Sequence, residues 1–276
     1  MRDIKVERLV QGVLIREGAG VKLHRYIGVE RTDEFEPLLL LDYFDSSDPM
    51  DFMAGFPPHP HRGFETITYL LDGYITHEDN KGHKGTIGPG DVQWMTAGKG
   101  IVHSEMPAVD SGRLRGMQLW LNLPAAEKMC KPRYQEVLGA ELPIEKPGSG
   151  ARIKVIGGKT DAGTESPITG IATKPLFFDI NLSLGASVQQ HIPQDYQAIL
   201  LVISGTILVG GQAVQHGVLA KLSSGDVLTL TAEKDSQCLL IAAMKLHEPI
   251  VRHGPFVMNT PAELKQALND FTSGRF

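Results

Sequence analysis

Half of the histidines in this chain lie close together in the sequence. Five of the ten fall within 45 residues, from His59 to His103. Two pairs in this stretch have a spacing of two: His59 with His61, and His103 with Glu105. Residues two apart on a strand project from the same face, so two neighbouring strands would bring three imidazoles and one carboxylate to one point. This ligand set suits a divalent first-row metal, and the spacing therefore predicts a mononuclear metal site.

A second carboxylate competes for the fourth ligand position. Glu65 lies four residues after His61, and on a strand this spacing places it on the same face as His59 and His61. Strand parity alone does not choose between Glu65 and Glu105. A histidine-rich strand pair that only makes hydrogen bonds at the mouth of a barrel is the alternative to a metal site.

The segments around these residues have the composition of strands. Residues 64–71 are rich in β-branched and aromatic side chains. Residues 92–96 have a similar composition and follow a Pro-Gly-Asp turn at 89–91. Both segments are therefore expected to be strands that position the histidine pairs.

Helix signals are scarce. The best one begins at Thr260, where Pro261 and Glu263 give the pattern of a helix N-terminus with a capping box. An apolar stripe follows at helical spacing, which predicts a terminal helix that packs against the strands. A second short helix is expected at 125–129. The chain is accordingly predicted to be all-β with a short C-terminal helix.

A β-rich unit occurs twice in the sequence. Gly73 is followed 18 residues later by Asp91, and Gly205 is followed 21 residues later by Asp226, within similar apolar surroundings. The repeat predicts two domains, an N-terminal metal-binding domain at 1–138 and a degenerate C-terminal domain with the terminal helix at 139–276.

The repeat also predicts which copy carries the chemistry. Equal offsets from its glycine and aspartate place His191 of the second copy at the position of His59. The same counting puts Cys238 and Leu240 at the positions of His103 and Glu105, and it keeps at most one candidate ligand of four. The second copy is therefore expected to be scaffold.

Composition excludes several classes of function. Lys+Arg 27 against Asp+Glu 32 gives a net charge of −5 without a basic run, which argues against direct nucleic-acid binding. Cys130 and Cys238 form no CxxC pair, so neither a disulfide scaffold nor a cysteine zinc site is expected. The charged N-terminal residues and the lack of a long apolar run predict a protein without signal peptide or membrane span. A cytoplasmic monomer is the expectation.

Four longer stretches resemble the pirin family of the cupin superfamily. They are residues 56–66 (FPPHPHRGFET), 90–107 (GDVQWMTAGKGIVHSEMP), 118–123 (QLWLNL) and 252–260 (RHGPFVMNT). The resemblance implies a bicupin, with two face-to-face antiparallel β-barrels of jelly-roll type. It further implies a metal in the N-terminal barrel only.

The resemblance also implies roles for single residues. The ligands would be His59, His61, His103 and Glu105, around iron(II), with manganese, cobalt, nickel, copper and zinc as alternatives. Glu65 is then expected to orient a ligand imidazole from behind.

The activity associated with such proteins is quercetin 2,3-dioxygenase. The resemblance implies that the metal holds a flavonol as its anion, aligned with dioxygen, and that Glu105 is a ligand, a general base for the 3-hydroxyl, or both. Phe56, Trp94 and Met95 are candidates for an apolar pocket wall, with ordinary packing as an equal explanation. One alternative is a non-catalytic, redox-sensing transcription cofactor that acts through a protein partner. Another is a zinc cupin of the sugar-isomerase type.

Overall fold

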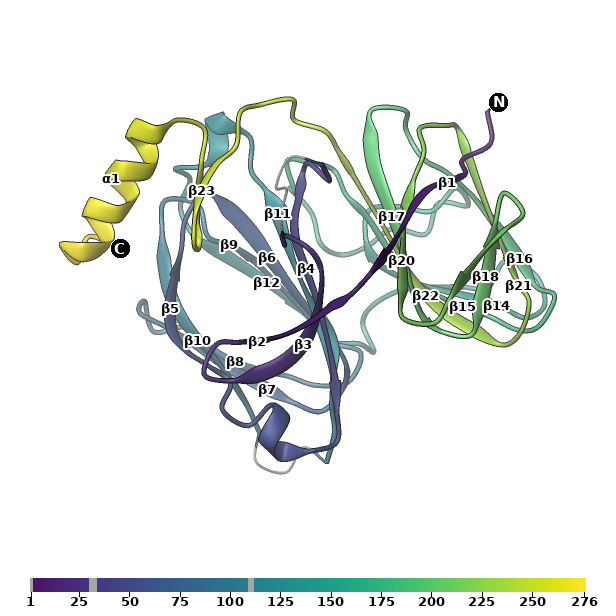
Figure 1. The fold of residues 1–276 in the computed structure, drawn as a ribbon, viewed down its shortest axis with the longest axis horizontal. Helices are drawn as coiled ribbons and strands as arrows, with labels where there is room; N and C mark the ends of the chain where they lie inside the picture. Colours follow the sequence, from purple (N-terminus) through teal and green to yellow (C-terminus); the bar gives the residue numbers. More distant parts are fainter. Residues whose placement is uncertain (1, 30–33, 109–111) are drawn as a thin grey trace. The chain divides into compact units, whose positions relative to one another are not determined.

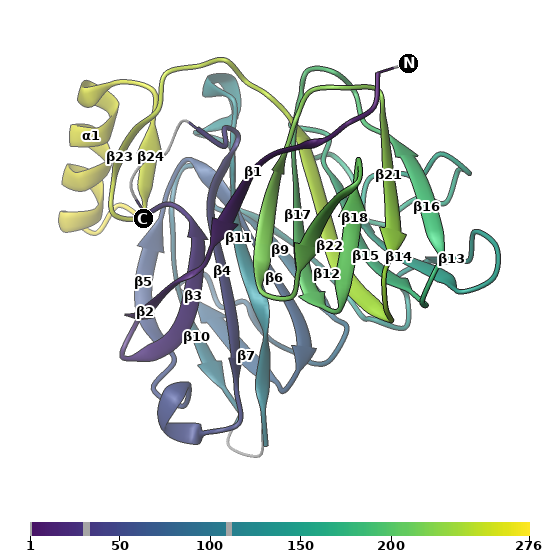
Figure 2. The same cartoon turned by 45° about the vertical axis from the view of Figure 1, so that its right-hand side comes forward.

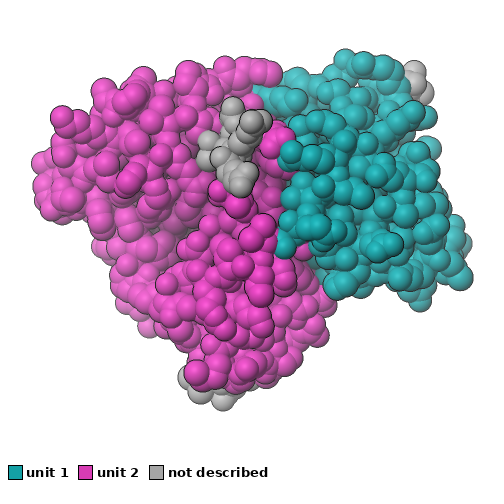
Figure 3. All heavy atoms as spheres, in the orientation of Figure 1, with its two compact units in different colours: residues 1–12, 141–245 teal, residues 13–140, 246–276 magenta. Residues whose placement is uncertain are grey.

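The computed structural model describes residues 2–29, 34–108 and 112–276. The fold is built almost entirely of antiparallel strands and ends in one α-helix, as the sequence predicts. The chain forms two compact units (Figure 3). We call residues 13–140 and 246–276 the histidine unit, and residues 1–12 and 141–245 the second unit. Within the described residues, no helix is sufficiently long and apolar to span a membrane.

The histidine unit contains a seven-stranded and a four-stranded sheet (Figure 1). In spatial order, the larger sheet consists of β12 (Arg133–Val137), β9 (Val92–Thr96), β6 (Phe64–Asp72), β11 (Leu114–Asn122), β4 (Leu38–Ser46), β3 (Val21–Ile27) and β2 (Val13–Glu17). The smaller sheet consists of β5 (Phe56–His61), β10 (Ile101–Pro107), β7 (Ile75–Asp79) and β8 (Lys84–Ile87). The sheets stay open at their edges, so the unit is a sandwich of the expected jelly-roll type and does not close into a barrel.

The second unit repeats this strand order. Its larger sheet consists of β1 (Val6–Gln11), β20 (Val218–Leu222), β17 (Tyr196–Ser204), β22 (Ser236–Met244), β15 (Leu176–Leu182), β14 (Ala151–Gly157) and β13 (Ile144–Glu145). Its smaller sheet consists of β16 (Ser187–His191), β21 (Val227–Ala232), β18 (Thr206–Val209) and β19 (Gln212–Gln215). The internal repeat inferred from the sequence is therefore present, and the two-cupin architecture is confirmed.

The two ends of the chain do not follow a linear division at 138/139. Residues 1–12 belong to the second unit, and residues 246–276 belong to the histidine unit. Strand β1 pairs with β20 and so completes the edge of the larger sheet in the second unit. The C-terminal hairpin, β23 (Val251–His253) with β24 (Phe256–Met258), belongs to the histidine unit. There Arg62 donates its backbone N–H to Pro255 and accepts one from Val257. Long-range strand pairing, which local composition does not reveal, sets these boundaries.

The strands of the two repeats correspond differently in the structure than equal sequence offsets predict. Asp91 precedes β9, whereas Asp226 precedes β21, which has the place of β10 in its own sheet. The expectation that Cys238 and Leu240 match His103 and Glu105 is therefore wrong, because both lie on β22, the counterpart of β11. Gly-Asp turns begin many strands and do not identify which strand follows.

Apolar residues occupy the interior of the second unit. Leu228 and Leu230 of β21 and Val188 of β16 are buried in its core cluster. These strands correspond to β10 and β5 of the histidine unit. The interior that would need to be polar for metal binding is thus filled with hydrocarbon.

The terminal helix α1 (Pro261–Thr272) has the predicted capping box. The Thr260 hydroxyl accepts the Glu263 backbone N–H, and the Glu263 carboxylate accepts the Thr260 backbone N–H. Its apolar side packs against Phe256 and Met258 of β24, and the helix lies beside the hairpin in both views (Figures 1 and 2). The second expected helix is only a 3-10 turn, Ala125–Glu127, which lacks a side-chain cap.

Candidate metal centre

Two antiparallel strands of the smaller sheet carry the predicted ligands. His59 and His61 lie on β5, and His103 and Glu105 lie on β10. His59 and His103 face each other directly in the register of the two strands. A register irregularity after His103 places Glu105 opposite Phe56. The alternation of strand side chains turns both members of each pair to the same side.

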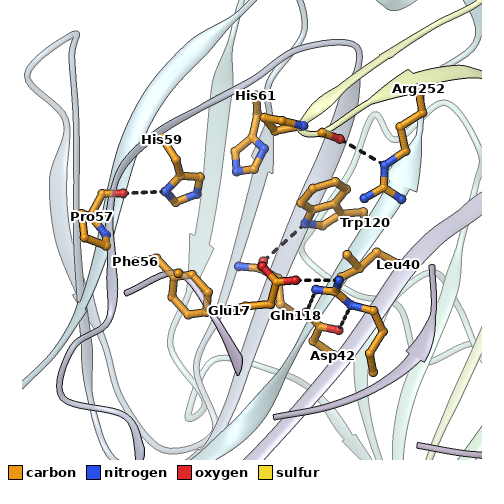
Figure 4. Close-up of a pocket in the computed structure, with 14 residues that line it drawn as sticks. Glu17, Leu40, Asp42, Phe56, Pro57, His59, His61, Gln118, Trp120 and Arg252 are labelled. Carbon is orange, nitrogen blue, oxygen red and sulfur yellow. Dashed lines mark hydrogen bonds and ion pairs between the residues drawn. The ribbon is translucent and has the colours of Figure 1, made fainter. Parts of the chain in front are cut away.

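The three imidazoles converge. The ring centroids of His59 and His103 are 4.5 Å apart, those of His59 and His61 are 4.7 Å apart, and those of His61 and His103 are 5.0 Å apart. One nitrogen from each ring lies within 4.8 Å of the others, so the group could hold a metal ion. Figure 4 shows His59 and His61 next to each other. The described residues of the second unit contain no comparable group.

The charge state of these histidines suits metal binding. Burial lowers the pKa of His61 well below its ordinary value, and the nearby His103 adds to this effect. Burial also lowers the pKa of His103, to about 4, against the opposing charge of Glu105. Within the described structure, no ring nitrogen of His61 or His103 has a hydrogen-bond partner. Two neutral imidazoles therefore present free lone pairs in a buried place, which is what a metal ion requires.

His59 is oriented by its own strand. Its Nδ1 lies 2.9 Å from the carbonyl oxygen of Pro57, and since a carbonyl only accepts, Nδ1 carries the proton. The Nε2 atom is then the nitrogen with the free lone pair. This backbone contact is a typical way of fixing the tautomer of a metal-ligating histidine.

Glu105 is buried beside the histidines. Its Oε2 lies 4.0 Å from Nε2 of His103. Gln118 donates to both carboxylate oxygens, at 3.1 and 2.9 Å, and the Thr68 hydroxyl donates to Oε1 at 3.2 Å. Burial alone would raise the pKa of Glu105, but His103, His59 and these hydrogen bonds outweigh it, and the pKa is lowered. A buried carboxylate is thus held ionised next to the three imidazoles.

Glu65 lies elsewhere. It is the second residue of β6, in the larger sheet, and its carboxylate accepts a 2.6 Å hydrogen bond from the Thr96 hydroxyl. Burial raises its pKa to about 7. None of the three clustered histidines is among its contacts in the described part of the chain. The imidazole-orienting role expected from the resemblance thus has no contact to support it.

A cavity of about 400 Å³ opens onto the cluster. Phe56, His59, His61, Gln118 and Trp120 are among the residues that line it (Figure 4). Its apolar walls thus include Phe56, as the sequence suggests.

The other two candidate pocket residues are placed differently. Trp94 and Met95 are fully buried in β9 and are not among the residues that line this cavity. Met95 belongs to a small core cluster with Ala97 and Ile101.

Charged residues at the cavity were not singled out from the sequence. The Arg252 guanidinium lies 4.7 Å from the centre of the Trp120 ring. Arg25 forms a two-point ion pair with Asp42 and a further one with Glu17. Arg252 and Trp120 both lie in stretches that resemble the pirin family, and this resemblance was the available signal for them.

A buried lysine fixes the end of β5. Lys128 Nζ donates to the backbone oxygens of Gly63 and Val257 and to the side-chain oxygen of Asn122. Burial lowers the pKa of Lys128 to about 8. The three acceptors lie on three different segments, so Lys128 ties the turn after His61 to the C-terminal hairpin.

Two models of known protein families match the chain. The Pirin family model matches residues 20–121, and the model of the Pirin C-terminal cupin domain matches residues 177–276. The chain belongs to the pirin family. As a pirin-family member it has the architecture expected from its motifs, with the convergent histidines in the first matched region.

Similar proteins span nearly the whole chain. A pirin-like protein of Caulobacter vibrioides is 46% identical over 271 residues, which cover 98% of each chain. Human pirin is 41% identical over 267 residues, which cover 94% of this chain and 89% of the human protein. A solved quercetin 2,3-dioxygenase from Acinetobacter baumannii matches with a TM-score of 0.92 and 33% identity, covering 99% of this chain and 98% of that one.

Proposed function

We propose that this pirin-family protein is an iron(II)-dependent flavonol 2,3-dioxygenase of the quercetinase type. The ion would be held by His59, His61, His103 and Glu105. The observation that carries the proposal is the convergence of three imidazoles, two of them neutral with free lone pairs, where His59 and His61 line a cavity of about 400 Å³. Similarity to the Acinetobacter baumannii quercetin 2,3-dioxygenase supports the substrate class.

The donor set fits a metal ion, and the side chains around the cavity would determine how a substrate approaches that ion. A bound ion supplies Lewis acidity toward the oxygen atoms of the substrate. Phe56 and Trp120 offer flat apolar surfaces for the aromatic rings, and their position at the cavity wall sets how the rings approach His59 and His61. Arg252 lies over the Trp120 ring and would add a positive charge near a phenolate of the substrate.

Glu105 is better suited to be a ligand than a general base. A general base works best when its pKa lies near the operating pH. The pKa of Glu105 is lowered, and its two oxygens are already engaged by Gln118 and Thr68. A carboxylate held ionised in this way fits a metal ligand set, with Gln118 as the group that orients it.

Oxygen uptake with quercetin tests the proposal. The iron-loaded protein is expected to consume oxygen and quercetin above the rate of the same concentration of free iron(II). His61→Ala should reduce the rate to that background, whereas His191→Ala, a change at an exposed histidine of the second unit, should not. Retained iron with no quercetin turnover would contradict the enzymatic proposal. It would favour the metal-dependent regulator acting through a protein partner.

A further inference from the structure

The histidine unit contains a second convergent group. His77 lies on β7, His83 lies in the turn before β8, and Glu136 lies on β12. Nε2 of His77 is 2.6 Å from Glu136 Oε1, and Nε2 of His83 is 3.0 Å from the same oxygen. One donor atom from each residue lies within 4.8 Å of the others. Three segments, from both sheets of the unit, thus bring two imidazoles and a carboxylate together.

The innermost member of this group is a buried histidine. His77 is 2% exposed, and its Nδ1 has no hydrogen-bond partner within the described structure, whereas its Nε2 contacts Glu136. A buried ring nitrogen without a partner is costly and calls for an explanation. The side chains of His83 and Glu136 are 35% and 32% exposed, so the group is reached from the surface.

The backbone of β8 comes close to these atoms at a glycine. Gly85 faces His77 in the register of β7 and β8. A Cβ atom at Gly85 would lie 2.7 Å from Nε2 of His77 and 3.1 Å from Oε2 of Glu136. A side chain at this position would crowd both groups, so glycine lets β8 pass close to the donor atoms.

Neighbouring side chains fix the geometry and the charge. The ring of Tyr134 stacks on that of His83, with centroids 4.2 Å apart and planes 22° apart. Gln93 donates to Glu136 Oε1 at 2.8 Å. The His77 imidazole, followed by His83 and Gln93, lowers the pKa of Glu136 to about 2, so the carboxylate is ionised at neutral pH.

We propose that His77, His83 and Glu136 form a second divalent-cation site, distinct from the cluster of His59, His61 and His103. Two imidazole nitrogens and one carboxylate oxygen form a typical three-ligand set for zinc, with the exposed side left to water. A bound ion would connect the β7–β8 hairpin of the smaller sheet to β12 of the larger one. Since His77 pairs directly with Glu105 across β7 and β10, the ion would also brace the strand next to the first cluster.

Zinc stoichiometry tests the proposal on the full chain. Metal-free protein is titrated with zinc chloride by calorimetry, and retained zinc is counted after gel filtration. The wild type is expected to bind two equivalents. His83→Asn and Glu136→Gln should each bind one, His61→Ala should bind one, and the His61→Ala/His83→Asn double variant should bind none. Circular dichroism checks that each variant is folded, and His83 is exposed enough for its replacement to be tolerated.

A matched control separates a three-ligand site from an ordinary histidine–carboxylate pair. His191 Nδ1 lies 2.7 Å from Asp161 Oδ2 on the surface of the second unit, without a third ligand. His191→Asn should leave two equivalents bound. Cobalt(II) added to the His61→Ala variant should give the visible absorption of a protein-bound ion. The His61→Ala/His83→Asn double variant should not show this absorption. Equal stoichiometry in the wild type and His83→Asn would overturn the proposal and leave a hydrogen-bond network centred on Glu136.

Discussion

Oε2 of Glu105 lies 4.0 Å from Nε2 of His103, with both side chains buried on the same side of β10. The carboxylate is held by Gln118 and Thr68, while both ring nitrogens of His103 lack a partner in the described structure. A positive ion between these groups would satisfy the histidine without displacing the hydrogen bonds of the carboxylate. The positions of Glu105 and His103 are therefore those expected of two ligands to the proposed metal ion.

Removal of the Glu105 charge should weaken metal binding more than it weakens the fold. Glu105→Gln keeps the shape of the side chain but loses an anionic ligand. We expect a loss of iron affinity larger than the roughly 10–100-fold that outer-shell changes cause. Competition with a chelator measures it. Glu78→Gln, at an exposed residue of β7, is the control and should bind iron as the wild type does. Equal affinity of Glu105→Gln and wild type would exclude Glu105 as a ligand.

Glu65 should make the stability of the fold depend on pH. Its pKa is about 7 in the folded protein and about 4.5 when unfolded, so the folded state binds the extra proton. Its contribution to stability is fully present below about pH 4.5 and is lost as the pH rises through about 7. Glu65→Gln cannot ionise and can still accept from Thr96. At pH 8 it should be more stable than the wild type by roughly 3 kcal/mol.

Urea unfolding at several pH values measures this difference. The advantage of Glu65→Gln should shrink toward zero as the pH falls from 8 to 4.5. A constant difference across this range would show that the ionisation of Glu65 is not its source.

Lys128 should be important for stability although it is remote from the cavity. Lys128→Met leaves the oxygens of Gly63, Val257 and Asn122 buried without a donor. Unsatisfied buried acceptors cost about 1–3 kcal/mol each, and the removed charge offsets part of this. We expect a net destabilisation of about 2–4 kcal/mol in urea unfolding. Lys99→Met, at an exposed position, should change the free energy of unfolding by less than about 0.5 kcal/mol.

The cavity wall should determine substrate affinity. Trp120→Ala removes a flat apolar surface, and loss of about 1.5–3 kcal/mol of contact should raise the KM for quercetin by roughly 10-fold or more. Iron content should stay the same. Trp94→Phe is the matched aromatic control, because Trp94 is buried outside the cavity, and it should leave KM unchanged. A larger effect at Trp94 than at Trp120 would contradict the assignment of this cavity as the substrate site.

Much of the candidate site follows from local spacing. His59 with His61 and His103 with Glu105 are pairs two apart, and strand geometry alone turns both members of each pair the same way. Parity could not exclude Glu65, because it gives the face of a strand and not the sheet to which the strand belongs. Glu65 lies on β6 of the larger sheet, whereas the histidine pairs lie on β5 and β10 of the smaller one.

The remaining features depend on long-range pairing. The group of His77, His83 and Glu136 requires β12 to lie beside β9, a neighbour relation that no local pattern encodes. The exchange of the two chain ends between the units likewise depends on β1 pairing with β20. Trp94 and Met95 are adjacent on a strand and so point to opposite faces, and both faces of β9 are covered. Their residue types suggested a pocket wall, but both side chains are buried and pack in the interior.

The most direct test is anomalous diffraction at the iron edge from crystals of the iron(II)-loaded protein. The account predicts a strong peak bounded by the side chains of His59, His61, His103 and Glu105, at about 2.0–2.2 Å from their nitrogen and oxygen atoms. Crystals that hold iron elsewhere, with no peak among these four side chains, would contradict it.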